Sequence, residues 1–154
     1  MKTRKDDACK HGFCKRLAPK SMKRLLPRHK MPQFHDYKDM KDFSRKINIP
    51  GKKMIVPLSS LRISQSEIRI SRSQQIAEQW KRKPNHSPLL VSLEEDGKHA
   101  IVDGHHRLMA ALLLQKEGYF SCSEPIHVYC IPAPVSLLIQ KAVQLGKNKI
   151  PQYF

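Results

Sequence analysis

The stretch that most constrains this chain is HAIVDGHHRLMAALLLQ, residues 99–115. It begins with a short apolar run that contains β-branched residues, and it ends with a segment that is apolar except for the final glutamine. Between the two stand an Asp-Gly pair, two histidines and an arginine. Such a pattern predicts a buried strand that turns directly into a buried helix. We therefore expect an α/β unit with nitrogen-bearing side chains gathered at this corner.

The corner is suited to an anion because of where its side chains fall on the expected helix. The first N–H groups of a helix have no partner within it, and the helix dipole adds positive potential there, so a phosphate meets several donors at once. We expect Asp103 to cap the helix and Gly104 to allow close approach of the chain. Arg107 is the strongest phosphate ligand because a guanidinium binds phosphate oxygens in pairs. His105 and His106 share that first turn.

Two other interpretations of the histidines stay open. A histidine near a helix start is often structural, and neighbouring histidines also suggest a metal site. Neighbouring residues diverge by about 100° around a helix, so His105 and His106 would not easily hold one ion together. Two histidines and an arginine in one turn are harder to explain by packing than by phosphate binding. The sequence therefore predicts a phosphate site and no metal site.

Turn residues and apolar periodicity divide the rest of the chain into short elements. A strand and turn are expected over 54–63, strands over 89–93, 99–102 and 126–131, and helices over 71–83, 105–118 and 133–146. Ser73 is the expected N-cap of the first of these helices, and Ile76, Ala77 and Trp80 share one of its faces. The order β-α-β-β-α-β-α predicts a compact α/β (α+β) domain with a small mixed sheet.

Charge is distributed unevenly along the chain, whose formal net charge is +16. Residues 1–53 contain 17 Lys and Arg against 5 Asp and Glu, a net charge of +12. Prolines interrupt this region, so we expect residues 1–50 to form a basic, disordered tail and residues 51–154 to form the domain. Polybasic segments attract nucleic acid through counterion release, which predicts nucleic acid as a partner. A purely solubilising extension is the alternative.

Other features indicate the expected cellular location and the redox state of the cysteines. The longest apolar run is shorter than a membrane-spanning helix, and the basic N-terminus lacks the apolar core of a secretory signal, so a cytoplasmic protein without a membrane partner is expected. Its four cysteines form no CxxC pair and are expected to be reduced thiols. An irregular zinc site is the alternative, although its spacing fits no common finger; its ligands would be Cys9, His11, Cys14 and His29.

Three stretches resemble the ParB/sulfiredoxin superfamily: IVPLSSLRISQSE, IAEQW and SPLLVSLEEDGKHAIVDGHHRLMAA, within about residues 54–132. The resemblance implies a compact domain in which residues 103–107 bind the phosphates of ATP, CTP or ADP, with Mg²⁺ as the expected metal cofactor. It also implies that Ser64, Gln65 and Glu67 face these phosphates across a cleft. Pro88 and Leu89 would form a wall on the base side.

Differences between this sequence and individual branches of the superfamily narrow the range of expected activities. Sulfiredoxins carry their nucleophilic cysteine where His105 stands, which argues against that activity. Chromosome-partition ParB proteins bind CTP at an arginine-rich version of the corner and continue into a helix-turn-helix and a dimerisation domain, which we do not expect here. Kinases of free serine resemble the corner and have an acidic catalytic residue in the loop that holds Glu67. Short plasmid and phage proteins with nucleotide hydrolysis or DNA cleavage form a fourth group.

Three functions follow from these observations. The favoured one is a nucleotide-binding, DNA-associated protein of the ParB-like type, an NTPase or nuclease in which Glu67, His105 and His106 are catalytic. The second is a small-molecule kinase with Glu67 as its base. The third is a non-catalytic adaptor that responds to nucleotide. The basic N-terminal region favours the first, because a kinase of a small metabolite gains little from it. The base, the acceptor and the oligomeric state stay open.

Overall fold

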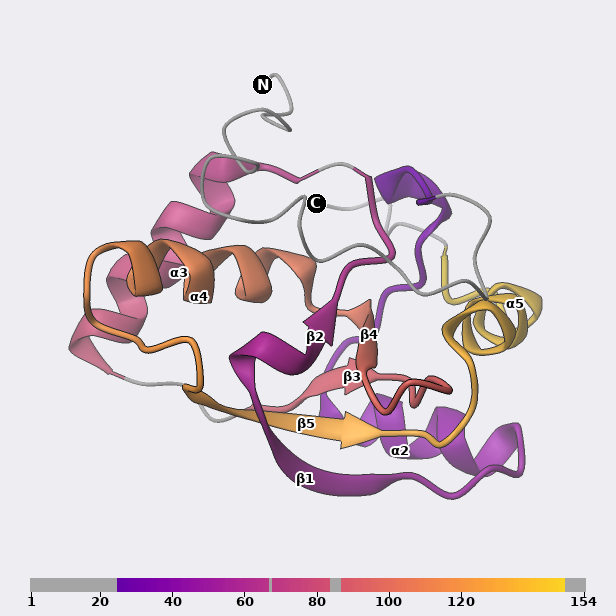
Figure 1. The fold of residues 1–154 in the computed structure, drawn as a ribbon. Coiled ribbons are helices and arrows are strands. Elements are labelled where there is room, and N and C mark those ends of the chain that lie inside the picture. The colour runs from indigo at the N-terminus through magenta and orange to yellow at the C-terminus, as the bar shows by residue number, and fades with distance from the viewer. Residues whose placement is uncertain (1–24, 67, 84–86, 149–154) are drawn as a thin grey trace.

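A five-stranded mixed sheet organises the computed structural model, which describes residues 25–66, 68–83 and 87–148 (Figure 1). The strand order is β1-β5-β3-β4-β2. Strand β5 is antiparallel to β1 and parallel to β3, and β4 is antiparallel to β3 and parallel to β2. The strands are β1 (Lys52–Pro57), β2 (Leu61–Arg62), β3 (Leu89–Val91), β4 (His99–Asp103) and β5 (Pro125–Cys130). The predicted α/β fold with a small mixed sheet is confirmed.

Four α-helices flank this sheet in the described part of the chain: α2 (Tyr37–Lys46), α3 (Ile70–Arg82), α4 (His105–Lys116) and α5 (Val135–Gln144). Short 3-10 turns cover Arg28–Lys30 and Leu58–Ser60. The three helices expected in the second half of the chain are present. However, α3 begins at Ile70 with no side-chain cap, and the Ser73 hydroxyl donates to the Arg69 carbonyl instead of capping the helix.

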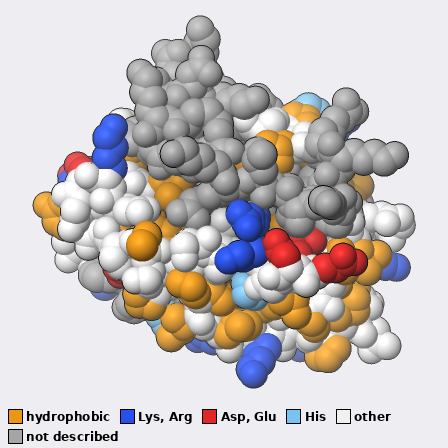
Figure 2. Space-filling model, viewed as in Figure 1, with side chains coloured by type: hydrophobic (Ala, Val, Ile, Leu, Met, Phe, Trp, Pro, Cys, Tyr) orange, Lys and Arg blue, Asp and Glu red, His pale blue; other side chains and the backbone are white. Residues whose placement is uncertain are grey.

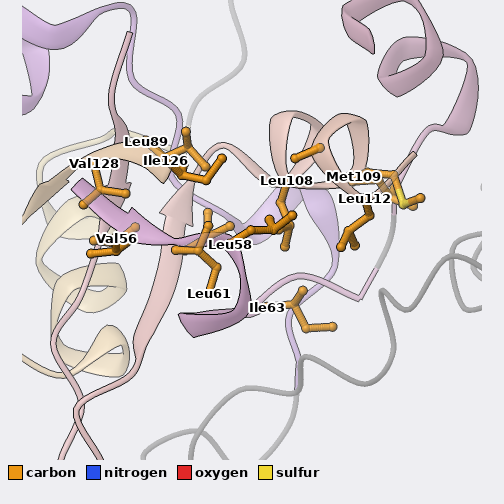
Figure 3. Packing of buried hydrophobic residues seen from close by; sticks show 14 of the residues in the cluster. Val56, Leu58, Leu61, Ile63, Leu89, Leu108, Met109, Leu112, Ile126 and Val128 are labelled. Carbon is orange, nitrogen blue, oxygen red and sulfur yellow. The ribbon is translucent and has the colours of Figure 1, made fainter. Parts of the chain in front are cut away.

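One face of the sheet packs against α3 and α4. Alternate strand residues point to this side, among them Leu89, Ile101 and Val128, and they meet Leu108 and Leu112 of α4 (Figure 3). All five side chains are buried. Because successive side chains of a strand point to opposite faces, the intervening residues must find a second apolar layer.

That second layer consists of α2 and α5, on the opposite face of the sheet (Figure 1). Leu90 and Val102 point toward it and pack with Phe43 of α2 and Leu138 of α5, all of them fully buried. The sheet therefore lies between two helical layers. This arrangement explains why its central strands are continuous apolar runs rather than alternating ones.

Residues 25–50 belong to this core, so the prediction of a disordered tail over residues 1–50 is wrong for that part. Helix α2 begins after Asp36, whose side chain accepts the Asp39 N–H at 2.9 Å. Met40 and Phe43 lie on its buried face with 3% and 0% of their surface exposed. Their spacing matches a helical period, but the stripe is short and lies among charged residues. For residues 1–24, which lie outside the described residues, a disordered tail stays a prediction.

Membrane-spanning helices, metal sites and disulfides can be described only for the part of the chain that the structure describes. No helix in it is long and apolar enough to cross a membrane. No three His, Cys, Asp or Glu side chains within it come together as a metal site. Cys122 and Cys130 are free thiols there. The proposed zinc ligands Cys9, His11 and Cys14 lie outside the described residues.

Candidate functional site

The predicted corner forms where β4 passes into α4 at Gly104. This glycine has φ +127°, in the region that L side chains rarely adopt. A Cβ placed on it would lie 2.8 Å from Cγ of Leu89. Gly104 is therefore needed both for the turn and for the packing of β3 beneath it. Leu89 fills the space behind the corner rather than forming the expected wall beside a base.

The N-terminal end of α4 has backbone N–H groups that no carbonyl of the helix itself accepts. Its hydrogen-bond ladder begins with the Leu108 N–H donating to the Gly104 carbonyl at 3.0 Å. The N–H groups of the three preceding residues have no carbonyl one turn earlier within the helix. The N-cap residue, Gly104, has no side chain that could cap this end, and the carboxylate of Asp103 accepts the Phe34 N–H at 3.0 Å. Asp103 therefore links the start of α4 to the N-terminal segment, and its role as the cap stays a prediction.

His105 lies inside the protein, with 3% of its surface exposed. Its Nε2 accepts the backbone N–H of Ser64 at 2.9 Å and that of Gln65 at 3.2 Å. Burial, together with the nearby His106, lowers the pKa of His105 to about 3, so the ring is neutral and can accept both bonds. The expected contact between this nitrogen and a phosphate does not occur in such an arrangement. His105 holds the polar loop after β2 against the corner.

Three side chains of that polar loop were predicted to face the phosphates, and the structure places one of them at the pocket. The Ser64 hydroxyl is fully buried, donates to the Ile101 carbonyl and lies 3.4 Å from Nε2 of His105, so it lies beside the corner without bordering the pocket. Gln65 does reach the pocket in front of the corner. Glu67, the predicted catalytic acid, lies outside the described residues.

His106 and Arg107 both contact neighbouring backbone. The Nε2 atom of His106 accepts the Arg69 N–H at 3.1 Å, which joins α4 to the start of α3. Arg107 donates to the carbonyls of Ser87 at 2.9 Å and Pro88 at 3.3 Å. Pro88 therefore serves through its carbonyl rather than as an apolar wall. Two of the five N–H groups of Arg107 position this loop, and the side chain still borders the pocket.

A pocket of about 430 Å³ lies in front of the corner, a size that suits a small organic ligand. It brings together the start of α4, one face of α3 and the segment that precedes α2. Its lining consists of residues 31–35, Gln65, Arg72, Ile76, Gln79, Trp80 and residues 103–107. Of the predicted site residues that are described, all except Ser64 border it.

The α3 wall adds residues that sequence reasoning missed. Arg72 lies in the first turn of α3 and Trp80 lies eight residues later, which separates them by about 12 Å along the axis. Trp80 is partly buried and stacks on Phe120 with ring centroids 6.3 Å apart. The signal for Arg72 was present, because it lies one turn before Ile76 on the face already assigned to packing.

The opposite wall is the segment 31–35, which was expected to be part of the tail. The Gln33 N–H donates to the Lys147 carbonyl at 2.7 Å, just beyond α5. The Phe34 ring packs on Phe43 of α2, with centroids 5.1 Å apart. These contacts, together with the bond to Asp103, hold the segment beside the corner. No local sequence signal marks such a wall.

Comparisons with known proteins find similarity only at the level of three-dimensional structure. No protein-family model matches the sequence, and no curated protein matches it either. A C-terminally truncated chromosome-partitioning protein ParB from Caulobacter crescentus, complexed with CTP-γ-S, superposes with a TM-score of 0.48 and 15% identity over 65% of this chain. Sulfiredoxin from Arabidopsis thaliana gives 0.43 and 19% over 58% of this chain. Protein Atu1540 from Agrobacterium tumefaciens gives 0.43 and 16% over 54%.

These similarities are partial. The chain covers 55% of the ParB chain and 40% of Atu1540, although it covers 96% of sulfiredoxin. The matches include proteins of two of the four branches named in the sequence resemblance. At identities of 15–19%, such similarity does not define an activity, which depends on the side chains of the pocket itself.

The charges in the pocket oppose one another at the corner. Burial raises the pKa of Asp103 to about 6, while Arg107 and the Phe34 N–H act in the opposite direction. Burial lowers the pKa of Arg107, which Asp103 in turn opposes. Arg72, on the far wall, is exposed to solvent and adds positive charge to the pocket. The pocket therefore offers cationic and N–H donors to an anion, with Asp103 close to its titration point at neutral pH.

Proposed function

We propose that this protein binds a nucleoside phosphate in the pocket at the start of α4 and associates with nucleic acid through its basic N-terminal region. The observation that carries the nucleotide proposal is that one pocket holds a helix N-terminus, two arginines and a tryptophan. A nucleotide needs both halves of this set. Its phosphates require donors and positive charge, and its base requires a flat apolar surface.

The phosphates would lie against α4. The N–H groups of its first turn, which have no acceptor within the helix, and the helix dipole favour an anion there. Arg107 borders the same space, and Arg72 faces it from α3. Mg²⁺ would be carried by the phosphates, since the carboxylate of Asp103 is buried and already accepts an N–H.

The base would lie toward Trp80. The distance of about 12 Å between Arg72 and Trp80 along α3 is comparable to the length of a mononucleotide. The amide side chains of Gln65 and Gln79, which also border the pocket, can donate and accept hydrogen bonds to a base edge or ribose. Such amides do not select one base by themselves. ATP, ADP and CTP are therefore all candidates.

The association with nucleic acid is supported by charge. Residues 1–53 carry a net charge of +12, whereas residues 54–154 carry only +4. Neutralising phosphates with Lys and Arg releases counterions and yields affinity without a base-specific contact. A small-molecule kinase and a non-catalytic adaptor remain the second and third candidates, because each also needs a nucleotide pocket.

Arg72→Gln is expected to weaken nucleotide binding by about 10-fold or more, the range for losing a hydrogen bond to a charged group. The substitution removes the charge on the α3 wall and leaves the corner intact. Isothermal calorimetry with ATP, ADP and CTP-γ-S would measure the change. The matched control is Arg82→Gln, an equal change on the last turn of the same helix and outside the pocket lining. Equal affinities for wild type and Arg72→Gln would contradict the proposed site.

Glu67→Gln tests whether the protein is an enzyme. Sequence resemblance assigns Glu67 as the base, and losing a general base typically costs about 100-fold in turnover. We expect phosphate release to fall by that factor while nucleotide affinity is kept. The control is Glu95→Gln, which changes an exposed acid in the β3–β4 turn. Undiminished turnover in Glu67→Gln would remove that residue from the mechanism, and absence of turnover in wild type would favour the adaptor.

A further inference from the structure

Lysines from α2 and β1 converge on one tyrosine. The Nζ atom of Lys41 lies 4.6 Å from the centroid of the Tyr37 ring, and that of Lys53 lies 5.3 Å from it. The Tyr37 ring packs edge-on against Tyr129 of β5, with centroids 5.4 Å apart. Gly51 makes room for this packing, since a Cβ there would meet the Tyr129 ring at 2.4 Å. Two cations from separate elements are thereby held beside one aromatic ring.

More cations extend this pair into a surface. Lys38, Lys41 and Arg45 are exposed and follow one another at helical spacing along α2. Lys52 and Lys53 are exposed at the start of β1, an edge strand of the sheet. We call these five residues the α2–β1 basic face.

Two of the three acidic residues of the same segment bond outside the α2–β1 basic face, and the third pairs with Arg45 within it. Asp36 caps α2, Asp39 is paired with Lys147 beyond α5, and Asp42 is paired with Arg45 at 3.2 Å. Residues 36–53 contain six Lys and Arg against these three Asp. Positive charge is thus concentrated on the α2–β1 basic face, where like charges repel one another until an anion is bound.

Positive charge is not continuous over the rest of the described surface. On the face seen in Figure 2, the Lys and Arg side chains of the described residues form no continuous band, and the central ones lie beside carboxylates. Arg62 of β2 is paired with Asp96, and their charged atoms are 3.8 Å apart. The described surface is therefore not uniformly basic.

We propose that the α2–β1 basic face binds the phosphate backbone of a nucleic acid. This inference rests on the nucleic-acid association proposed above and assigns it to a folded surface. From Lys38 to Arg45 the helix rises by about 10 Å. Phosphates of one duplex strand follow at about 3.4 Å along the axis, so the stripe spans about three of them.

An anionic membrane is the other polyanion such a surface might meet, and α2 does not suit it. A helix that lies on a membrane needs an exposed apolar face to insert. The apolar residues of α2, Met40 and Phe43, are buried in the core of this protein. What α2 presents to solvent is charge at regular spacing on a rigid element, which is what a phosphate backbone requires.

The test is the salt dependence of binding by the full chain. Wild type and Lys41→Gln/Lys53→Gln are titrated with a 20-base-pair duplex and with a single strand of equal length over a series of salt concentrations. Removing two phosphate contacts should lower the slope of log affinity against log salt by about 1.8 for the duplex and about 1.4 for the single strand. A second variant, Lys38→Gln/Lys52→Gln, leaves the Tyr37 contacts intact and should show a similar loss.

Two controls distinguish binding at the α2–β1 basic face from nucleic-acid binding elsewhere on the protein. Lys83→Gln/Lys116→Gln removes equal charge at the C-terminal ends of α3 and α4 and should leave the slope nearly unchanged. Equal losses in this control would overturn the α2–β1 assignment. So would a loss confined to Lys2→Gln/Arg4→Gln/Lys5→Gln/Lys10→Gln, although nucleic-acid association itself would then stand.

Two further arms complete the test. Binding of the lysine variants to vesicles that contain phosphatidylserine is measured beside the nucleic-acid titrations, and a loss seen only with vesicles would overturn the proposal. Absence of nucleic-acid binding by wild type would overturn both the surface and the proposed association. Nucleotide affinity is measured on the α2–β1 variants and on the Lys83→Gln/Lys116→Gln control and should not change, since none of these described residues borders the pocket.

Discussion

Phe43→Ala is expected to lower the free energy of unfolding by about 3–5 kcal/mol, the usual cost of truncating a buried phenylalanine. Phe43 is fully buried and belongs to the apolar layer between the sheet and helices α2 and α5. Its ring also packs on Phe34, which lines the pocket. The substitution therefore leaves a cavity and loosens the segment 31–35.

Urea denaturation followed by circular dichroism would measure this loss. Tyr119→Ala is the control, because it removes an aromatic ring that is 62% exposed and should change stability by less than about 0.5 kcal/mol. A loss below about 1 kcal/mol for Phe43→Ala would mean that α2 is not part of the cooperative core. Deleting residues 1–50 would remove α2 altogether, so such a truncation would test folding rather than charge.

Asp103→Asn is expected to remove a pH-dependent cost in stability of about 3 kcal/mol. Burial raises the pKa of Asp103 to about 6 in the folded protein, against 3.8 for an ordinary aspartate. Below about pH 4 the group is protonated in both states, and above about pH 6 the folded state carries a buried negative charge. The stability that Asp103 contributes is therefore present at low pH and is lost as the pH rises through about 6. Asparagine keeps an acceptor for the Phe34 N–H and carries no charge.

The measurement is the free energy of unfolding of wild type and variant between pH 4 and pH 8. The difference between the two isolates Asp103, because other titrating groups are common to both proteins. Relative to wild type, the variant should become more stable as the pH rises. Asp96→Asn, at an exposed turn, should give a curve parallel to wild type. A parallel curve for Asp103→Asn would show that its carboxyl does not titrate as described.

Local patterns of the sequence predicted the elements that carry the site. The strand 99–103, the turn at Gly104 and helix α4 follow from an apolar run, a glycine and a helical period, all within 18 residues. The Asp-Gly turn between β3 and β4 is of the same kind: Gly97 has φ +79°, and the Glu94 N–H donates to the Lys98 carbonyl at 3.0 Å. Backbone conformation at such places depends on residues a few positions apart, and these are visible in a sequence.

The same patterns failed for α2. Its buried apolar stripe consists of Met40 and Phe43 and stands among lysines and aspartates, so charge dominated the interpretation. The apolar runs of strands β3 and β4, at residues 89–91 and 100–102, held the missing information, because a strand buried on both faces needs helices on both sides. One of those helices had to come from outside the segment first assigned to the domain.

By itself, the sequence determined where a strand becomes a helix and that an aspartate, two histidines and an arginine gather there. Only the tertiary structure decided what those side chains do. His105 accepts N–H groups 40 and 41 residues away, and Asp103 accepts one 69 residues away. Each bond depends on how two distant segments pack on the sheet. The environment of a side chain, and with it its protonation and its freedom to meet a ligand, is set by contacts that are far apart in sequence and that no local period encodes.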